Sequence, residues 1–69
     1  MLIDCTPSPC LEIPEEAALI GQGEVVTYGS LKAAYEGRKY DFYRHWGETY
    51  ARDKKGKTLR LYYAVYFND

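Results

Sequence analysis

The chain has few of the side chains that build metal centres or covalent cross-links. Its 69 residues include two cysteines, Cys5 and Cys10, and one histidine, His45. A structural zinc site needs four ligands, so we expect no metal and no cofactor. No nucleophile stands beside a candidate base, no glycine-rich phosphate loop occurs, and so small a domain leaves little room for a catalytic cleft. We therefore expect no catalytic residues and no enzyme activity.

Long hydrophobic segments are also missing. No stretch approaches the ~18 apolar residues that span a bilayer, and the N-terminus lacks a basic segment followed by an apolar run. These absences predict a cytoplasmic protein in which Cys5 and Cys10 stay reduced.

Basic residues are absent from the first 31 positions, which hold five carboxylates. Residues 32–60 contain all nine Lys and Arg against four carboxylates, although the formal net charge of the chain is -1. Such asymmetry indicates a face that binds a polyanion. Two solvated faces that differ in charge are the alternative.

Turn residues and hydrophobic spacing divide the chain into an irregular N-terminal arm, residues 1–13, and a winged-helix-like domain, residues 14–69. Three helices are predicted, over residues 14–20, 28–36 and 40–54. The third rests on Tyr43, Trp46 and Tyr50, which recur at helical spacing and would form a core face.

Two strands complete the predicted fold. The β-branched residues of Glu24–Thr27 favour the first, and the alternation in Thr58–Phe67 favours the second. In the second strand one face would carry Leu59, Leu61, Tyr63, Val65 and Phe67, and the other Arg60, Tyr62, Ala64 and Tyr66. The expected architecture is a small α+β winged-helix-like domain of three helices with a two- to three-stranded antiparallel sheet.

Two segments carry a resemblance to a known family. Gly23–Leu31, with Thr27-Tyr28-Gly29 at its centre, and Arg44-His45-Trp46-Gly47 resemble the DNA-binding unit of the methylated-DNA–cysteine methyltransferases and alkyltransferase-like proteins. The resemblance covers residues 20–53. It implies that Tyr28 presses on a phosphate and that Arg44 enters the base stack. The family's Pro-Cys-His-Arg acceptor motif is missing from the last strand, so alkyl transfer by that mechanism is excluded.

The residues themselves also indicate a nucleic-acid surface, with DNA favoured, because a basic helix face and turn would neutralise phosphates. Arg44 would read a base edge, and Tyr28 would donate to a phosphate at a helix N-terminus. Glu48 on the same face opposes this, and Tyr28 packed beneath the second strand is the alternative. The expected nucleic-acid-binding residues are Tyr28, Ser30, Arg44, His45, Arg52, Lys54, Lys55 and Lys57.

A second patch, formed by Arg60, Tyr62 and Tyr66, has the Tyr/Arg composition that is enriched in protein interfaces, unless the first helix covers it. The last strand could also pair with a second copy and form a homodimer. Two functions follow. The first is a non-catalytic winged-helix-like module on nucleic acid, a regulator or accessory factor. The alternative is a small phage-type inhibitor or adaptor that blocks a host protein machine such as a CRISPR effector.

Overall fold

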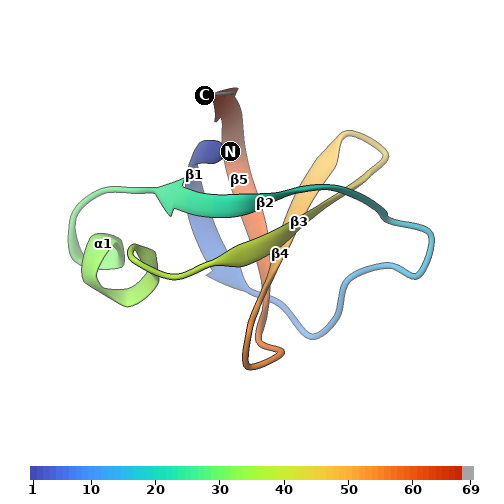
Figure 1. The fold of residues 1–69 in the computed structure, drawn as a ribbon, viewed down its shortest axis with the longest axis horizontal. Helices are drawn as coiled ribbons and strands as arrows, with labels where there is room; N and C mark the ends of the chain where they lie inside the picture. Colours follow the sequence, from blue (N-terminus) through green and yellow to red (C-terminus); the bar gives the residue numbers. More distant parts are fainter. Residues whose placement is uncertain (68–69) are drawn as a thin grey trace.

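Five β-strands form a closed barrel in the computed structural model, which describes residues 1–67 (Figure 1). In chain order the elements are β1 (Leu2–Pro9), β2 (Ala18–Val26), α1 (Ser30–Tyr35), β3 (Tyr40–His45), β4 (Glu48–Asp53) and β5 (Thr58–Phe67). Each strand pairs with the next one in the chain, and β5 pairs back with β1. All pairs are antiparallel except β1 with β2.

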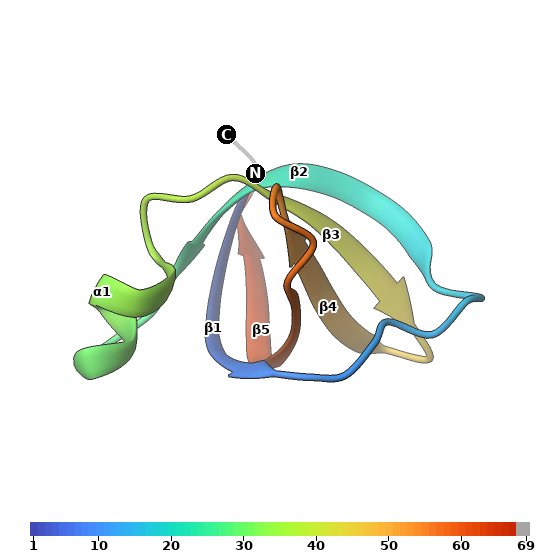
Figure 2. The same ribbon diagram turned by 90° about the horizontal axis from the view of Figure 1, so that it is seen from below.

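The parallel pair requires the chain to cross the barrel, because parallel neighbours cannot be joined by a tight turn. Only Leu2–Asp4 pairs with Glu24–Val26. The first half of β2 lies along β3 instead. Residues 10–17 leave the end of β1 and reach the start of β2 on the opposite side of the barrel (Figure 2).

Side chains that alternate along the strands fill the barrel. The buried apolar residues that pack together there are Ile3, Cys5, Val25, Tyr35, Tyr40, Phe42, Ala51, Leu59 and Leu61. Tyr50 is also buried, but on the outer face of β4, where the Arg60 guanidinium lies over its ring. Aromatic rings are suited to such a small interior, since each buries a large area. The short helix α1 is tied to this core by Tyr35, whose carbonyl accepts a hydrogen bond of 2.9 Å from the Tyr40 hydroxyl.

An extra residue in β5 reverses which side chains face inward. Between Asp4 and Thr6 of β1, the partner strand runs from Val65 to Tyr62 and so contains one residue more. Tyr63 lies in this bulge with a φ of 57°. A bulge shifts the alternation by one position. Beyond it Ala64 packs against the core, while Val65 is exposed.

The expected winged-helix-like α+β fold is wrong, because the only helix in residues 1–67 is α1 and a helix-turn-helix is missing from them. Residues 40–54 form the β3–β4 hairpin, although their aromatic spacing also suits a helix. Trp46 and Gly47, with φ of 52° and 79°, make a two-residue turn of the kind that joins twisted strands. Residues 14–20 form the connection and the start of β2. Residues 2–9, expected in an irregular arm, form β1.

Three predicted elements agree with the structure. The last strand has the predicted bounds, Thr58–Phe67, and Glu24–Val26 ends β2. The helix expected after Thr27 is present as α1. On the last strand the predicted faces hold as far as Leu61. Beyond the bulge the two faces are exchanged. Tyr66 therefore lies on the inner face, and is separated from Arg60 and Tyr62 on the outer face.

Gly23 is a position where no side chain fits. A Cβ built on Gly23 would lie 1.8 Å from the Met1 carbonyl oxygen, which accepts a 3.1 Å hydrogen bond from the Glu24 amide. We expect Gly23→Ala to lower the free energy of unfolding by about 3 kcal/mol, because the backbone of Met1 must move. Urea unfolding followed by circular dichroism measures this.

The control is Gly37→Ala, which meets nothing within 4 Å and carries only the cost of its φ of 81°. That cost is about 1 kcal/mol. Equal losses for the two variants would contradict the close approach of Met1 to Gly23.

Candidate functional site

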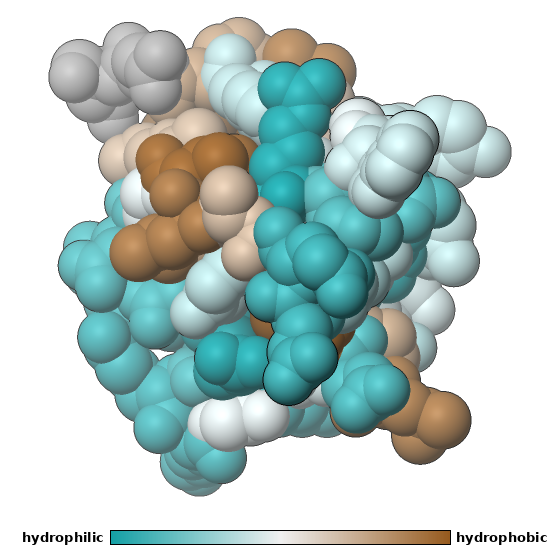
Figure 3. Space-filling model, turned by 90° about the vertical axis from the view of Figure 1, so that its right-hand side faces the viewer, coloured by the Kyte–Doolittle hydropathy of each residue, from teal (hydrophilic) through white to brown (hydrophobic). Residues whose placement is uncertain are grey.

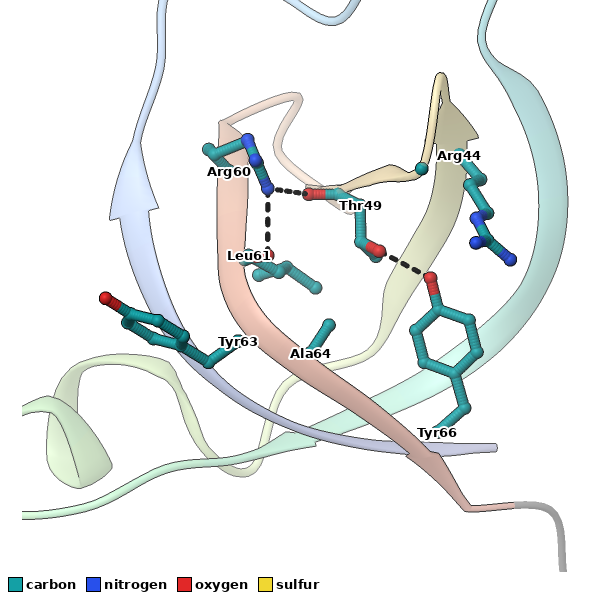
Figure 4. A pocket seen from close by; sticks show the side chains of 8 residues that line it. Arg44, Thr49, Arg60, Leu61, Tyr63, Ala64 and Tyr66 are labelled. Carbon is teal, nitrogen blue, oxygen red and sulfur yellow. Dashed lines mark hydrogen bonds between the residues drawn. The ribbon is translucent and has the colours of Figure 1, made fainter.

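A cavity of about 380 Å³ opens where β5 separates from β4 (Figure 4). The β4–β5 ladder ends at the pair Thr49 and Leu61, and the rest of β5 pairs with β1. The β3–β4 turn closes the other side. The lining residues are Arg44, Gly47, Thr49, Arg60, Leu61, Tyr63, Ala64 and Tyr66.

Within residues 1–67, Arg44 is the cation in this cavity that has no anionic partner. Its guanidinium carbon lies 5.9 Å from the centre of the Tyr66 ring, and the Tyr66 hydroxyl is hydrogen bonded to that of Thr49. The structure gives it no carboxylate within 4.0 Å in residues 1–67. Its charge is therefore available to an anionic ligand, beside an aromatic ring of fixed orientation.

Arg60 has a different, structural position. It donates hydrogen bonds to the carbonyls of Leu61, at 3.0 Å, and Thr49, at 3.5 Å, where the β4–β5 ladder ends (Figure 4). Its Nη2 also lies 3.6 Å from the Glu48 carboxylate. Two tyrosine rings, Tyr50 and Tyr62, lie 5.5 and 4.6 Å from its guanidinium carbon. These contacts hold the Arg60 side chain in place and compensate its charge. Arg60 therefore contributes more to the shape of the surface than to its free positive charge.

The outer face of β3 and β4 carries a second arginine on a tyrosine. The Arg52 guanidinium carbon lies 5.3 Å from the Tyr43 ring centre, and Nη1 donates to the Tyr43 hydroxyl at 3.4 Å. Arg52 is exposed and has no carboxylate within 4.0 Å among the described residues. Glu48 accepts a 3.0 Å hydrogen bond from the Tyr50 hydroxyl in addition to its ion pair. Its negative charge is thus partly compensated.

Two exposed aromatic residues beside the cavity have backbone conformations that large side chains rarely adopt. Trp46 is 90% exposed and Tyr63 is 87% exposed, and they are the only non-glycine residues of positive φ in residues 1–67. Such conformations cost about 1–3 kcal/mol each and gather at functional sites. The sequence interpretation placed Trp46 in the core, which is wrong. The signal that was missed is a two-residue turn between alternating segments.

A second group of cations lies at the start of β3 and the end of β4. Cross-strand pairing of Tyr40 with Asp53 brings residues 37–39 beside residues 54–57. A cavity of about 210 Å³ is lined there by Arg38, Lys39, Asp53, Lys54 and Lys55. The expected lysines are therefore joined by Arg38 and Lys39, which the sequence interpretation missed because it placed them in a loop before a helix.

Tyr28 and Ser30 lie apart from these groups, and His45 follows Arg44 at the end of β3. The Tyr28 hydroxyl donates to the Asp4 carboxylate, which raises the pKa of Tyr28. Ser30 begins α1, on the side of the barrel away from the β3–β4 turn (Figure 1). His45 Nε2 lies 3.5 Å from the Glu16 carboxylate. Arg44 and Arg52 lie on β3 and β4, on opposite faces of the hairpin, so the recognition helix implied by the family resemblance is missing from residues 1–67.

Comparison with protein-family models, curated proteins and solved structures finds no match.

Among the described residues no helix has the length and apolar character needed to cross a membrane. Within the same residues no three His, Cys, Asp or Glu side chains are grouped as metal ligands. The side that carries the β3–β4 turn has a hydrophilic centre, with apolar patches towards its edges (Figure 3).

We expect Trp46→Asn to raise the free energy of unfolding by about 1 kcal/mol, because Asn tolerates positive φ at this turn position and little buried area is lost. The melting temperature should rise by about 4–8 °C in a domain of this size. Trp46→Phe, which keeps an aromatic ring in the same conformation, is the control. A loss of stability in Trp46→Asn would show that the indole packs against the barrel.

The two free thiols should differ in reactivity. Burial, with a smaller contribution from Asp4, raises the pKa of Cys5 to about 12, whereas Cys10 is only half-buried. At pH 8 the Cys5 thiolate is thus about one part in 10⁴, and thiolate is the reactive form. We expect one thiol per native chain to react rapidly with an aromatic disulfide reagent, and Cys10→Ser to abolish that phase. Rapid labelling of both cysteines would contradict this.

Proposed function

We propose that the protein is a non-catalytic binding module for nucleic acid, acting as a regulator or accessory factor. The observation that supports this best is the pair Arg44 and Arg52. Arg52 of β4 lies over Tyr43 of the neighbouring strand β3 on the outer face, and Arg44 of β3 lies over Tyr66 of β5 in the cavity. Neither arginine has a carboxylate within 4.0 Å in residues 1–67. Guanidinium groups bind phosphate through paired donors, and tyrosine rings stack on bases.

The shape of the surface favours a single strand over a duplex. A duplex is usually read by an element that enters the major groove. The outer face of β3–β4 presents Arg52 on the Tyr43 ring instead, while Arg44 lies on the inner side, at the cavity. Unstacked bases of a single strand can lie on such rings without sequence preference. We therefore propose single-stranded nucleic acid as the ligand, in place of duplex DNA that a recognition helix would read through its groove.

A second candidate is an inhibitor or adaptor that binds a protein, such as a component of a host defence machine. The observation that favours it is the outer face of β5 beyond the bulge, where Tyr63, Val65 and Phe67 are all exposed. Exposed apolar residues in one row are typical of protein interfaces. The nucleic-acid surface lies on β3 and β4, so substitutions distinguish the two candidates.

The test measures the affinity of a fluorescent single-stranded oligonucleotide by polarisation at several salt concentrations. We expect Arg52→Ala to weaken binding by about five- to tenfold at low salt. Each lost phosphate contact also lowers the slope of log affinity against log salt by about 0.7. Lys32→Ala is the matched control, because it removes one exposed positive charge from α1, where Lys32 pairs with Glu36 at 3.6 Å.

Equal effects of Arg52→Ala and Lys32→Ala would remove the support for this surface. If the unmodified protein binds no oligonucleotide at 20 mM salt, the nucleic-acid proposal fails and the protein-binding candidate takes its place. That candidate then predicts that Val65→Lys, and not Arg52→Ala, abolishes capture of a stoichiometric protein partner.

A further inference from the structure

Five of the nine basic residues meet at one end of the β3–β4–β5 sheet, the basic end, although they come from two segments of the chain. Its members are Arg38, Lys39, Lys54, Lys55 and Lys57. Pairing of Tyr40 with Asp53 sets the α1–β3 loop against the β4–β5 turn. This arrangement concentrates like charges, which repel one another and so oppose folding.

Two carboxylates, Asp53 and Glu24, lie beside these five cations, so positive charge remains in excess. Asp53 accepts hydrogen bonds of 2.9 Å from the backbone amides of Lys55 and Lys57, so it holds the turn together. Lys39 lies 3.8 Å from Glu24. The other four cations have no carboxylate within 4.0 Å in the part of the chain that the structure describes. A polyanion would neutralise this excess charge.

The outer face of β4 runs from the basic end to the opening of the large cavity beside Arg60. Side chains alternate along a strand, so Arg52, Tyr50 and Glu48 point outward in succession from the turn that carries Lys54. The six residues of β4 span roughly 20 Å at about 3.3 Å per residue. Arg52 on Tyr43 lies on this outer face, nearest to the basic end. Arg44 on Tyr66 lies on the inner side of the sheet, within the cavity.

We propose that the basic end binds backbone phosphates of the same single strand whose bases contact the tyrosines of β3–β5. The inference rests on the proposed function and adds a second contact region to it. A strand long enough to reach from Arg44 to Lys54 and Lys55 needs at least about four nucleotides, the lower limit of sites on small barrels. Short oligonucleotides then bind only at the cavity, whereas longer ones bind at the cavity and at the basic end.

The experiment compares two fluorescent oligothymidylates, of two and twelve nucleotides, on the full chain. Lys54→Gln/Lys55→Gln removes two charges at the basic end and keeps polar side chains, and Lys32→Gln is the control on α1. We expect the double variant to bind the 12-mer at least tenfold more weakly at 50 mM salt, with the salt slope lower by about 1.4. Its affinity for the dinucleotide should change less than twofold.

The Lys32→Gln control, and a thermal melt of each variant followed by circular dichroism, distinguish a loss of binding from misfolding. An unchanged 12-mer affinity in the double variant, with Arg52→Ala still defective, overturns the second contact region and leaves the proposed function intact. Equal weakening for both lengths also overturns it, because the basic end would then be the primary site. A 12-mer duplex that binds as tightly as the single strand overturns the single-strand assignment. If neither oligonucleotide binds the unmodified protein, both proposals fail.

Discussion

The pairing of the first strand with the last is the interaction on which the rest of the structure depends. It closes the barrel, so the strands of residues 1–67 form one continuous ladder around the core. The bulge at Tyr63 lies within this pairing and decides which β5 side chains face the interior. Tyr66 thereby meets Thr49 and Arg44 inside the cavity, while Tyr63 is left in water. The register of β1 against β5 therefore determines both how the barrel closes and which β5 side chains line the cavity.

The charged side chains of β3 and β4 show how a near-neutral chain can present a basic surface. Carboxylates around the sheet are engaged in specific contacts: Asp53 with turn amides, Glu48 with Arg60, and Asp41 with Gln22 at 2.8 Å. Arg44 and Arg52, which have no such partner in residues 1–67, lie on tyrosine rings instead. Net charge therefore says little about this protein's ligand, because the distribution of unpaired charge decides what the surface attracts.

Local signals in the sequence were sufficient for some elements and misleading for others. Alternation over Thr58–Phe67 predicted β5 with its correct ends, but a bulge depends on the partner strand, so the exchange of faces after Leu61 could not be read from β5 alone. Aromatic residues at Tyr43, Trp46 and Tyr50 fit a helix as well as a hairpin. Two of the predicted binding residues, Arg44 and Arg52, lie in the candidate site, and their role stays a prediction. Arg38 was missed because only strand pairing brings it to the lysines.

The parallel pairing of β1 with β2 has a consequence for how the protein can be divided. β1 is held on both sides by backbone ladders and by Ile3 and Cys5 inside the barrel, whereas Leu11 and Glu12 in the connection are exposed. A protease that nicks this connection leaves an assembled complex of a short peptide and a large fragment. The molecule is therefore suited to division into a split protein. A synthetic peptide with the sequence of β1 would complete the barrel of the larger fragment.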